Sequence, residues 1–175
     1  MQANTVKPGA NKLSNILDKL IIRIGKTVSW ANLLLIIVTL LQVLLRYGFN
    51  HGLVVLEELE WHLYSFAYMI GLSYAVVTDS HVRVDVLQSK FSLETREWIE
   101  FLGHLFLLLP FILVLIYYGV EFTHSSFILN EHSNAPLGLP FRWIIKAVIP
   151  ISFILLLIAV ISRMVKSLLI IFGRE

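Results

Sequence analysis

The stretch that decides the fold is VVLEELEWHLYSFAYMIGLSYAVV, residues 54–77. It is long enough to form a helix that crosses a bilayer, whose hydrocarbon core is about 30 Å thick. Four titratable groups stand in its first turns, namely Glu57, Glu58, Glu60 and His62. Because ionisable groups inside a membrane are costly, this end of the helix is either a site of chemistry or an edge that another protein covers.

Three other stretches have the same apolar character, and they cover roughly residues 27–45, 98–120 and 141–162. The whole chain is 57% hydrophobic and only 15% charged, with a mean hydropathy of +0.78. Soluble domains carry about 25% charged residues. These features predict an all-α membrane protein with four transmembrane helices.

The positive charges predict how these spans are oriented. Most of the 14 lysines and arginines fall in the N-terminal segment, in the loop between the second and third spans, and after the fourth span. Since cytoplasmic loops are rich in Lys and Arg, we expect both termini in the cytoplasm. The expected organisation is a cytoplasmic segment over residues 1–26, a transmembrane domain over residues 27–162 and a cytoplasmic tail over residues 163–175.

The N-terminal segment carries the pattern of an amphipathic helix. Its apolar residues recur at spacings of three and four, and its basic residues share the opposite face. The apolar set is Leu13, Ile16, Leu17, Leu20, Ile21 and Ile24, and the basic set is Lys12, Lys19, Arg23 and Lys26. We expect this helix to lie in the cytoplasmic surface of the membrane. A plain continuation of the first span into water is the alternative.

A helical wheel divides residues 54–77 into two faces. One face is polar, aromatic or small, which suits contact with protein, and consists of Glu57, Trp61, Tyr64, Ser65, Tyr68 and Ala75. The other face suits lipid and consists of Leu59, Leu63, Phe66, Ile70 and Val77. A proton or ion path is the functional alternative for the acidic end. Because only tyrosines can ionise between His62 and Asp79, such a path would stop part of the way across, and we favour a structural edge.

Other polar groups give weaker signals. His62 and His104 would suit the two axial ligands of a haem, but their expected depths differ by roughly 9 Å, whereas ligands of one iron lie nearly level. His124, Glu131 and His132 lack the spacing of a zinc site, so we expect a solvated loop there. With no cysteine and no nucleophile or phosphate-binding motif, the sequence predicts no enzyme activity, no cofactor and no metal.

The segment HVRVDVL, residues 81–87, alternates polar and apolar residues as a strand does. In an extended chain Arg83 and Asp85 would point to the same side. Contact with lipid headgroups or with a partner protein is one interpretation, and a plain surface loop is the other.

Three ordered stretches resemble a known family. They are QVLLRYGFN at residues 42–50, LEELEWHLYSFAYMIGLSYAVVTDSHVRVDVL at residues 56–87, and NAPLGLPFRWIIKAVIPISFILLL at residues 134–157. Together they are similar to the small, DctQ-like membrane subunit of tripartite ATP-independent periplasmic (TRAP) transporters. The resemblance covers most of residues 13–165.

The resemblance implies a multi-pass protein of the bacterial inner membrane, which is a subunit of a sodium-coupled transporter for organic acids. Its partners would be a large membrane subunit that moves as an elevator, a periplasmic substrate-binding protein and membrane lipids, and no nucleic acid. The small subunit would flank the stationary part of the large subunit and would not itself hold the substrate. Positions that match the family pattern are Arg46, Tyr47, Glu57, Glu58, His81, Arg83, Asp85 and Pro140.

The acidic start of residues 54–77 then has a structural interpretation. We expect Glu57 and Glu58 to pair with Arg46 of the same chain or with a partner, and we expect Trp61, Tyr64 and Tyr68 to belong to the same partner interface. The chain departs from the family pattern at Leu56, at Glu60 and in the loop EFTHSSFILNEHSNAPLG. Two other functions remain open: a haem- or quinone-binding anchor of an oxidoreductase, and a small transporter that works alone as an oligomer.

Overall fold

The computed structural model describes residues 12–80 and 91–173, and the regular elements within these ranges are all helices. The fold is therefore all-α, as the sequence predicts, in the part of the chain that the structure describes. The helices are α1 (Lys12–Val28), α2 (Trp30–Gly48), α3 (Val54–Val77), α5 (Leu93–Gly103), a π-helical turn (His104–Leu108), α6 (Leu109–Ile128) and α7 (Trp143–Phe172).

Two pairs of these elements join into very long helices. A single turn at Ser29 separates α1 from α2, so that Ser14–Gly48 runs as 35 residues of nearly continuous helix. The segment Leu93–Ile128 is likewise one helix of 36 residues that the π-helical turn interrupts. At about 1.5 Å per residue each is roughly 50 Å long, well above the thickness of a bilayer core.

The π-helical turn has a cause in the sequence. Pro110 has no backbone N–H and would clash with the carbonyl of the residue four positions before it in a regular α-helix. At this point the backbone N–H of Leu109 donates to the carbonyl of His104, five residues back. The wider turn accommodates the proline without breaking the helix.

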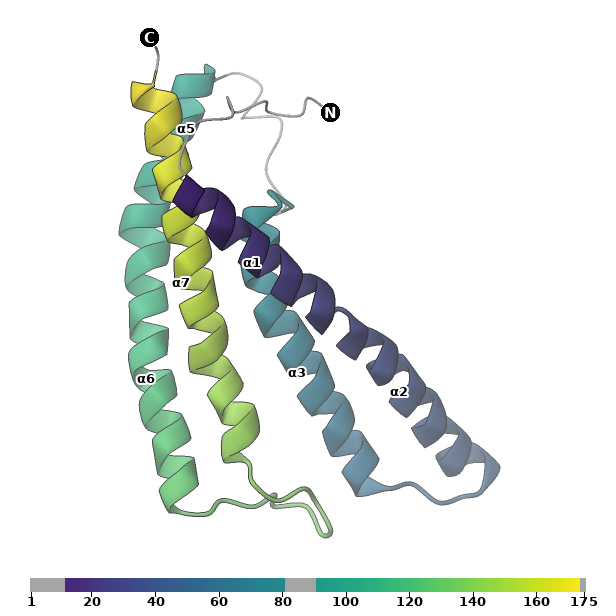
Figure 1. The fold of residues 1–175 in the computed structure, drawn as a ribbon. Helices are drawn as coiled ribbons and strands as arrows, with labels where there is room; N and C mark the ends of the chain where they lie inside the picture. The colour runs from purple at the N-terminus through teal and green to yellow at the C-terminus, as the bar shows by residue number, and fades with distance from the viewer. Residues whose placement is uncertain (1–11, 81–90, 174–175) are drawn as a thin grey trace.

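The long helices lie side by side in one layer. The main contacts run from α2 to α3, from α3 to α7 and from α7 to α6, so the two outer helices of the layer are α2 and α6 (Figure 1). Helix α1 crosses over α3 and α7 and contacts both of them (Figure 1). The chain is thus an open slab of helices that leaves much apolar surface uncovered, and not a closed bundle.

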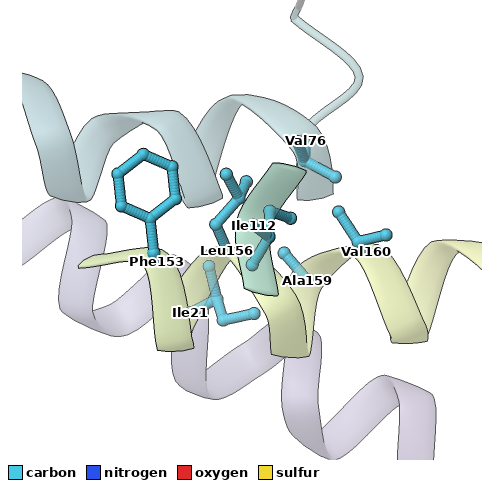
Figure 2. Close-up of a cluster of buried hydrophobic side chains, with 7 residues drawn as sticks. All are labelled: Ile21, Val76, Ile112, Phe153, Leu156, Ala159 and Val160. Atoms are coloured by element: carbon cyan, nitrogen blue, oxygen red, sulfur yellow. The ribbon is translucent and has the colours of Figure 1, made fainter. Parts of the chain in front are cut away.

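The core lies where α1, α3, α6 and α7 meet (Figure 2). Its buried side chains are Ile21, Val76, Ile112, Phe153, Leu156, Ala159 and Val160. Small residues let the helices approach closely, as in other membrane helix pairs. A Cβ atom added to Gly25 of α1 would lie 2.5 Å from Cδ2 of Tyr74 on α3, and one added to Gly119 of α6 would lie 3.2 Å from Cγ2 of Ile149 on α7.

One prediction about α3 is wrong. The face assigned to lipid consists of Leu59, Leu63, Phe66, Ile70 and Val77. None of these side chains is exposed, and Ile70 retains only 4% of its surface. The physical reason is that α3 packs between α2 and α7 and that α1 crosses it at Tyr74, which a helical wheel of one segment cannot show.

The prediction of four spans is confirmed in part. By length and composition, three helical segments of the described chain can cross a membrane: Ser14–Gly48, Leu93–Ile128 and Trp143–Phe172. Helix α3 has the bounds that the sequence predicts but is less apolar, because its acidic start and its tyrosines lower its hydropathy. Helix α7 continues through residues 163–172, where a separate tail is expected, since its last turns pack against α5.

Candidate functional site

The acidic start of α3 lies beside the end of α2. A carboxylate oxygen of Glu57 is 3.7 Å from the Arg46 guanidinium, and these side chains are 48% and 62% exposed. The Gln42 amide donates to Glu57 at 3.1 Å, and the backbone N–H of Leu53 donates to Gln42 at 3.3 Å. The structure therefore brings Arg46 and Glu57 together. Their exposed ion pair is weak, whereas the buried Gln42 connects the two helices more closely.

Glu58 makes the most extensive contact of the acidic group. Its carboxylate accepts hydrogen bonds from the hydroxyl of Ser133 and from the backbone N–H of Leu139, both in the loop between α6 and α7 (residues 129–142, the α6–α7 loop). A Cβ atom on Gly138 would lie 2.5 Å from Cβ of Ser133 and 2.8 Å from a carboxylate oxygen of Glu58, so the loop packs tightly around this contact. Glu58 thus holds the loop against α3 and does not pair with Arg46.

Sequence reasoning missed this role of Glu58. Its partners are 75 and 81 residues away along the chain. The partner groups, a hydroxyl and a backbone N–H, carry no charge, so the sequence gives no sign that they bind the carboxylate of Glu58. The one available signal was the acid at a helix start together with a loop rich in small and turn-forming residues. The neighbouring His62 contacts the backbone of the same residue, since its Nδ1 lies 2.5 Å from the carbonyl oxygen of Glu58.

The α6–α7 loop carries its own ion pair. The ammonium of Lys146 on α7 contacts the carboxylate of Glu131 and lies 3.9 Å from the ring centroid of Phe122, while Arg142 is 3.8 Å from the same carboxylate. The Lys146 ammonium, as a hydrogen-bond donor and a positive charge, holds the pKa of Glu131 below its ordinary value, and Arg142 acts in the same direction, against an opposing effect of desolvation. The loop expected to be plainly solvated is therefore tied to the ends of α6 and α7.

An aromatic row runs along the exposed side of α3. It consists of Trp61, Tyr64 and Tyr68, all of which are more than half exposed. The rings of Tyr64 and Tyr68 are stacked, with centroids 6.0 Å apart. No described part of the chain covers the row, so it is available to lipid or to another protein. Tyr47, at the end of α2, is also exposed.

A second charged cluster lies at the opposite end of the slab. Arg163 of α7 donates to Glu97 and Glu100 of α5, at 3.3 Å and 3.0 Å, and all three side chains are largely buried. Lys166, one turn further on, contacts Asp18 of α1. Sequence reasoning missed these pairs, although the matching spacings of Glu97–Glu100 and Arg163–Lys166 on apolar helices were a usable signal.

The other predicted residues are less informative. His81, Arg83 and Asp85 lie outside the described residues. Pro140 precedes Phe141, whose backbone is left-handed with φ 61°. Among the described residues there is no group of three or more His, Cys, Asp or Glu side chains arranged to hold a metal ion. The geometry can join helices and present an aromatic surface, but it assembles no catalytic constellation in the part of the chain that is described.

Comparisons with known proteins agree with the resemblance seen in the sequence. Residues 35–169 match the family model described as "Tripartite ATP-independent periplasmic transporters, DctQ component". The chain is also 30% identical over 143 residues to a protein of Haemophilus influenzae described as "Putative TRAP transporter small permease protein". That match covers 81% of this chain and 85% of the relative.

Proposed function

The chain belongs to the DctQ family, the small membrane component of TRAP transporters, and from this premise we propose that it supports a larger, moving membrane subunit. The observation that carries this proposal is the shape of the chain. A single layer of long helices has little interior in which to hold a solute, but it has two broad faces against which another membrane protein can pack (Figure 1).

We propose that four segments of the chain cross the bacterial inner membrane. Helix α3 is the fourth, because it is packed between α2 and α7, which are apolar enough to span. The start of α1 and the end of α7 meet at one end of the slab, where Lys166 contacts Asp18. The positive-inside rule assigns that end to the cytoplasm, so the loop after α2 and the α6–α7 loop face the periplasm.

We further propose that the aromatic row is the surface that docks on the large subunit. Aromatic side chains are large, stiff and able to make hydrogen bonds, which suits them to protein interfaces. Trp61, Tyr64 and Tyr68 lie on the side of α3 that the rest of the described chain leaves open. Docking there would leave the α1 side of the slab to face lipid.

The α6–α7 loop is our proposed contact for the periplasmic binding protein. Glu58 and the Glu131 ion pair fix the loop, so it can present side chains in one arrangement. Leu137 is 88% exposed and has a left-handed backbone with φ 63°. Such a conformation is costly for leucine and is kept where it serves a contact. Sodium coupling and an organic-acid substrate are further proposals from the family, and both belong to the large subunit.

Co-purification tests the docking surface. We would express the chain with its large subunit and replace the aromatic row, as Trp61→Ala, Tyr64→Ala and Tyr68→Ala together. The complex should be lost while the variant still inserts and folds. A matched control removes three exposed aromatic residues of α6, in the variant F111A/Y117A/Y118A. Equal loss of the complex in both variants, or in neither, would contradict docking through α3.

A further inference from the structure

Helix α1 has a basic face that the protein fold does not use. Lys19, Arg23 and Lys26 are exposed, and with Ile22, Thr27 and Trp30 they line a shallow surface pocket of about 370 Å³. The three cations are spaced four and three residues apart, so they lie on one side of the helix. Trp30, which begins α2, lies at the end of this side and is itself exposed.

The packing of α1 fixes where this basic face points. On the other side of the helix Ser14 and Ile21 are buried, and Gly25 lies so close to Tyr74 that it has no room for a Cβ atom. The helix therefore cannot rotate to bring its cations inward. The nearby Asp18 faces α7 and is occupied by Lys166 and Ser162.

The basic face also lacks a charge partner in the described part of the chain. No ion pair joins Lys19, Arg23 or Lys26 to another described residue, and no acidic side chain lines the pocket. Apolar side chains flank the cations: Ile16 and Leu20 are both exposed on neighbouring positions of α1. Cations beside exposed aliphatic groups and a tryptophan are the combination found at the boundary between headgroups and acyl chains.

We propose that this face of α1 binds the phosphate headgroup of an anionic phospholipid in the cytoplasmic leaflet. The three cations contact the phosphate, Trp30 lies at the level of the headgroup, and Ile16 and Leu20 contact the acyl chains. The inference rests on the membrane orientation proposed above.

Native mass spectrometry of the detergent-solubilised chain tests this site. The full chain is titrated with phosphatidylglycerol, with phosphatidylethanolamine and with inorganic phosphate. We expect phosphatidylglycerol to bind at concentrations about tenfold lower than phosphatidylethanolamine, since each cation near an anionic lipid adds to binding. Equal binding of the two lipids would overturn the proposal. Displacement of phosphatidylglycerol by equimolar inorganic phosphate would also overturn it, because the site would then select a free anion.

Three variants test which residues bind the lipid headgroup. The neutral variant K19Q/R23Q/K26Q should lose the preference for phosphatidylglycerol, while the charge-conserving variant K19R/K26R should keep it. The control R46Q/R142Q removes positive charge at the other end of the slab and should bind phosphatidylglycerol as the unmodified chain does. Retention of the preference by the neutral variant would refute the site. Since these measurements use the chain alone, they are independent of docking to the large subunit, which co-purification reports.

Discussion

The cluster around Arg163 makes the strongest prediction about stability. Side-chain exposures are 17% for Arg163, 5% for Glu97 and 13% for Glu100, so the cluster is largely withdrawn from water. The buried Glu97 accepts from no other described residue. The variant Arg163→Gln would leave two carboxylates close together without a compensating cation. Removing one partner of a buried ion pair costs about 3–5 kcal/mol, and we expect a loss of this size in the free energy of unfolding.

The exposed pair at the other end of the slab provides the matched control. Arg46 and Glu57 are 3.7 Å apart and about half exposed, and such pairs contribute roughly 0–1 kcal/mol. The variant Arg46→Gln should therefore change the free energy of unfolding by less than about 1 kcal/mol. The two variants remove the same charge and differ mainly in how deeply the pair is buried.

Denaturant unfolding in detergent micelles, followed by tryptophan fluorescence, measures both variants. Trp98 reports on the packing of this end of the slab, because its ring contacts Phe101 of α5 and Phe172 of α7. The additional change Glu97→Gln should recover part of the loss in Arg163→Gln by removing one uncompensated charge. If Arg163→Gln is no more destabilising than Arg46→Gln, then burial of the cluster does not govern its contribution, and the reasoning fails.

Three further predictions follow from the contacts. Replacing Glu58 with alanine leaves the backbone N–H of Leu139 without its acceptor, at a cost of about 1–3 kcal/mol in the free energy of unfolding. Hydrogen exchange of the Leu139 amide should accelerate, and unchanged protection of that amide would refute the contact. The variant Gly25→Ala should destabilise the chain by about 1–3 kcal/mol through overpacking, whereas Gly71→Ala, which meets no neighbouring atom, should be neutral or stabilising in thermal unfolding. Because the pKa of Glu131 is lowered, its ion pair stabilises the fold above about pH 4.5, and this stabilisation is lost as the pH falls through the lowered pKa. The variant K146Q should raise the pKa of Glu131 in an NMR titration, and an unchanged pKa would contradict the role given to Lys146.

Local patterns in the sequence predicted the local structure well. The bounds of α3 match the apolar stretch that begins with the acidic group. The helical pattern of this stretch depends on residues within a few positions of each other. The family assignment is likewise confirmed, because it rests on the order and spacing of motifs along the chain.

Contacts between distant segments could not be predicted in the same way. Glu58 binds a loop far along the chain, and neighbouring helices cover the side of α3 that looked suited to lipid. In a membrane protein, lipid-facing and protein-facing surfaces have similar composition, since apolar side chains suit both environments. A helical wheel therefore identifies which residues share a face, but it does not show whether that face contacts lipid or another helix.

The central claim is that this chain supports a transporter and does not transport by itself. The most direct measurement is sodium-driven uptake of an organic acid into proteoliposomes. We would compare vesicles that contain this chain alone with vesicles that contain the chain and its large subunit, with the periplasmic binding protein added outside. The account predicts uptake only in the second case. Uptake by vesicles that contain this chain alone would contradict it.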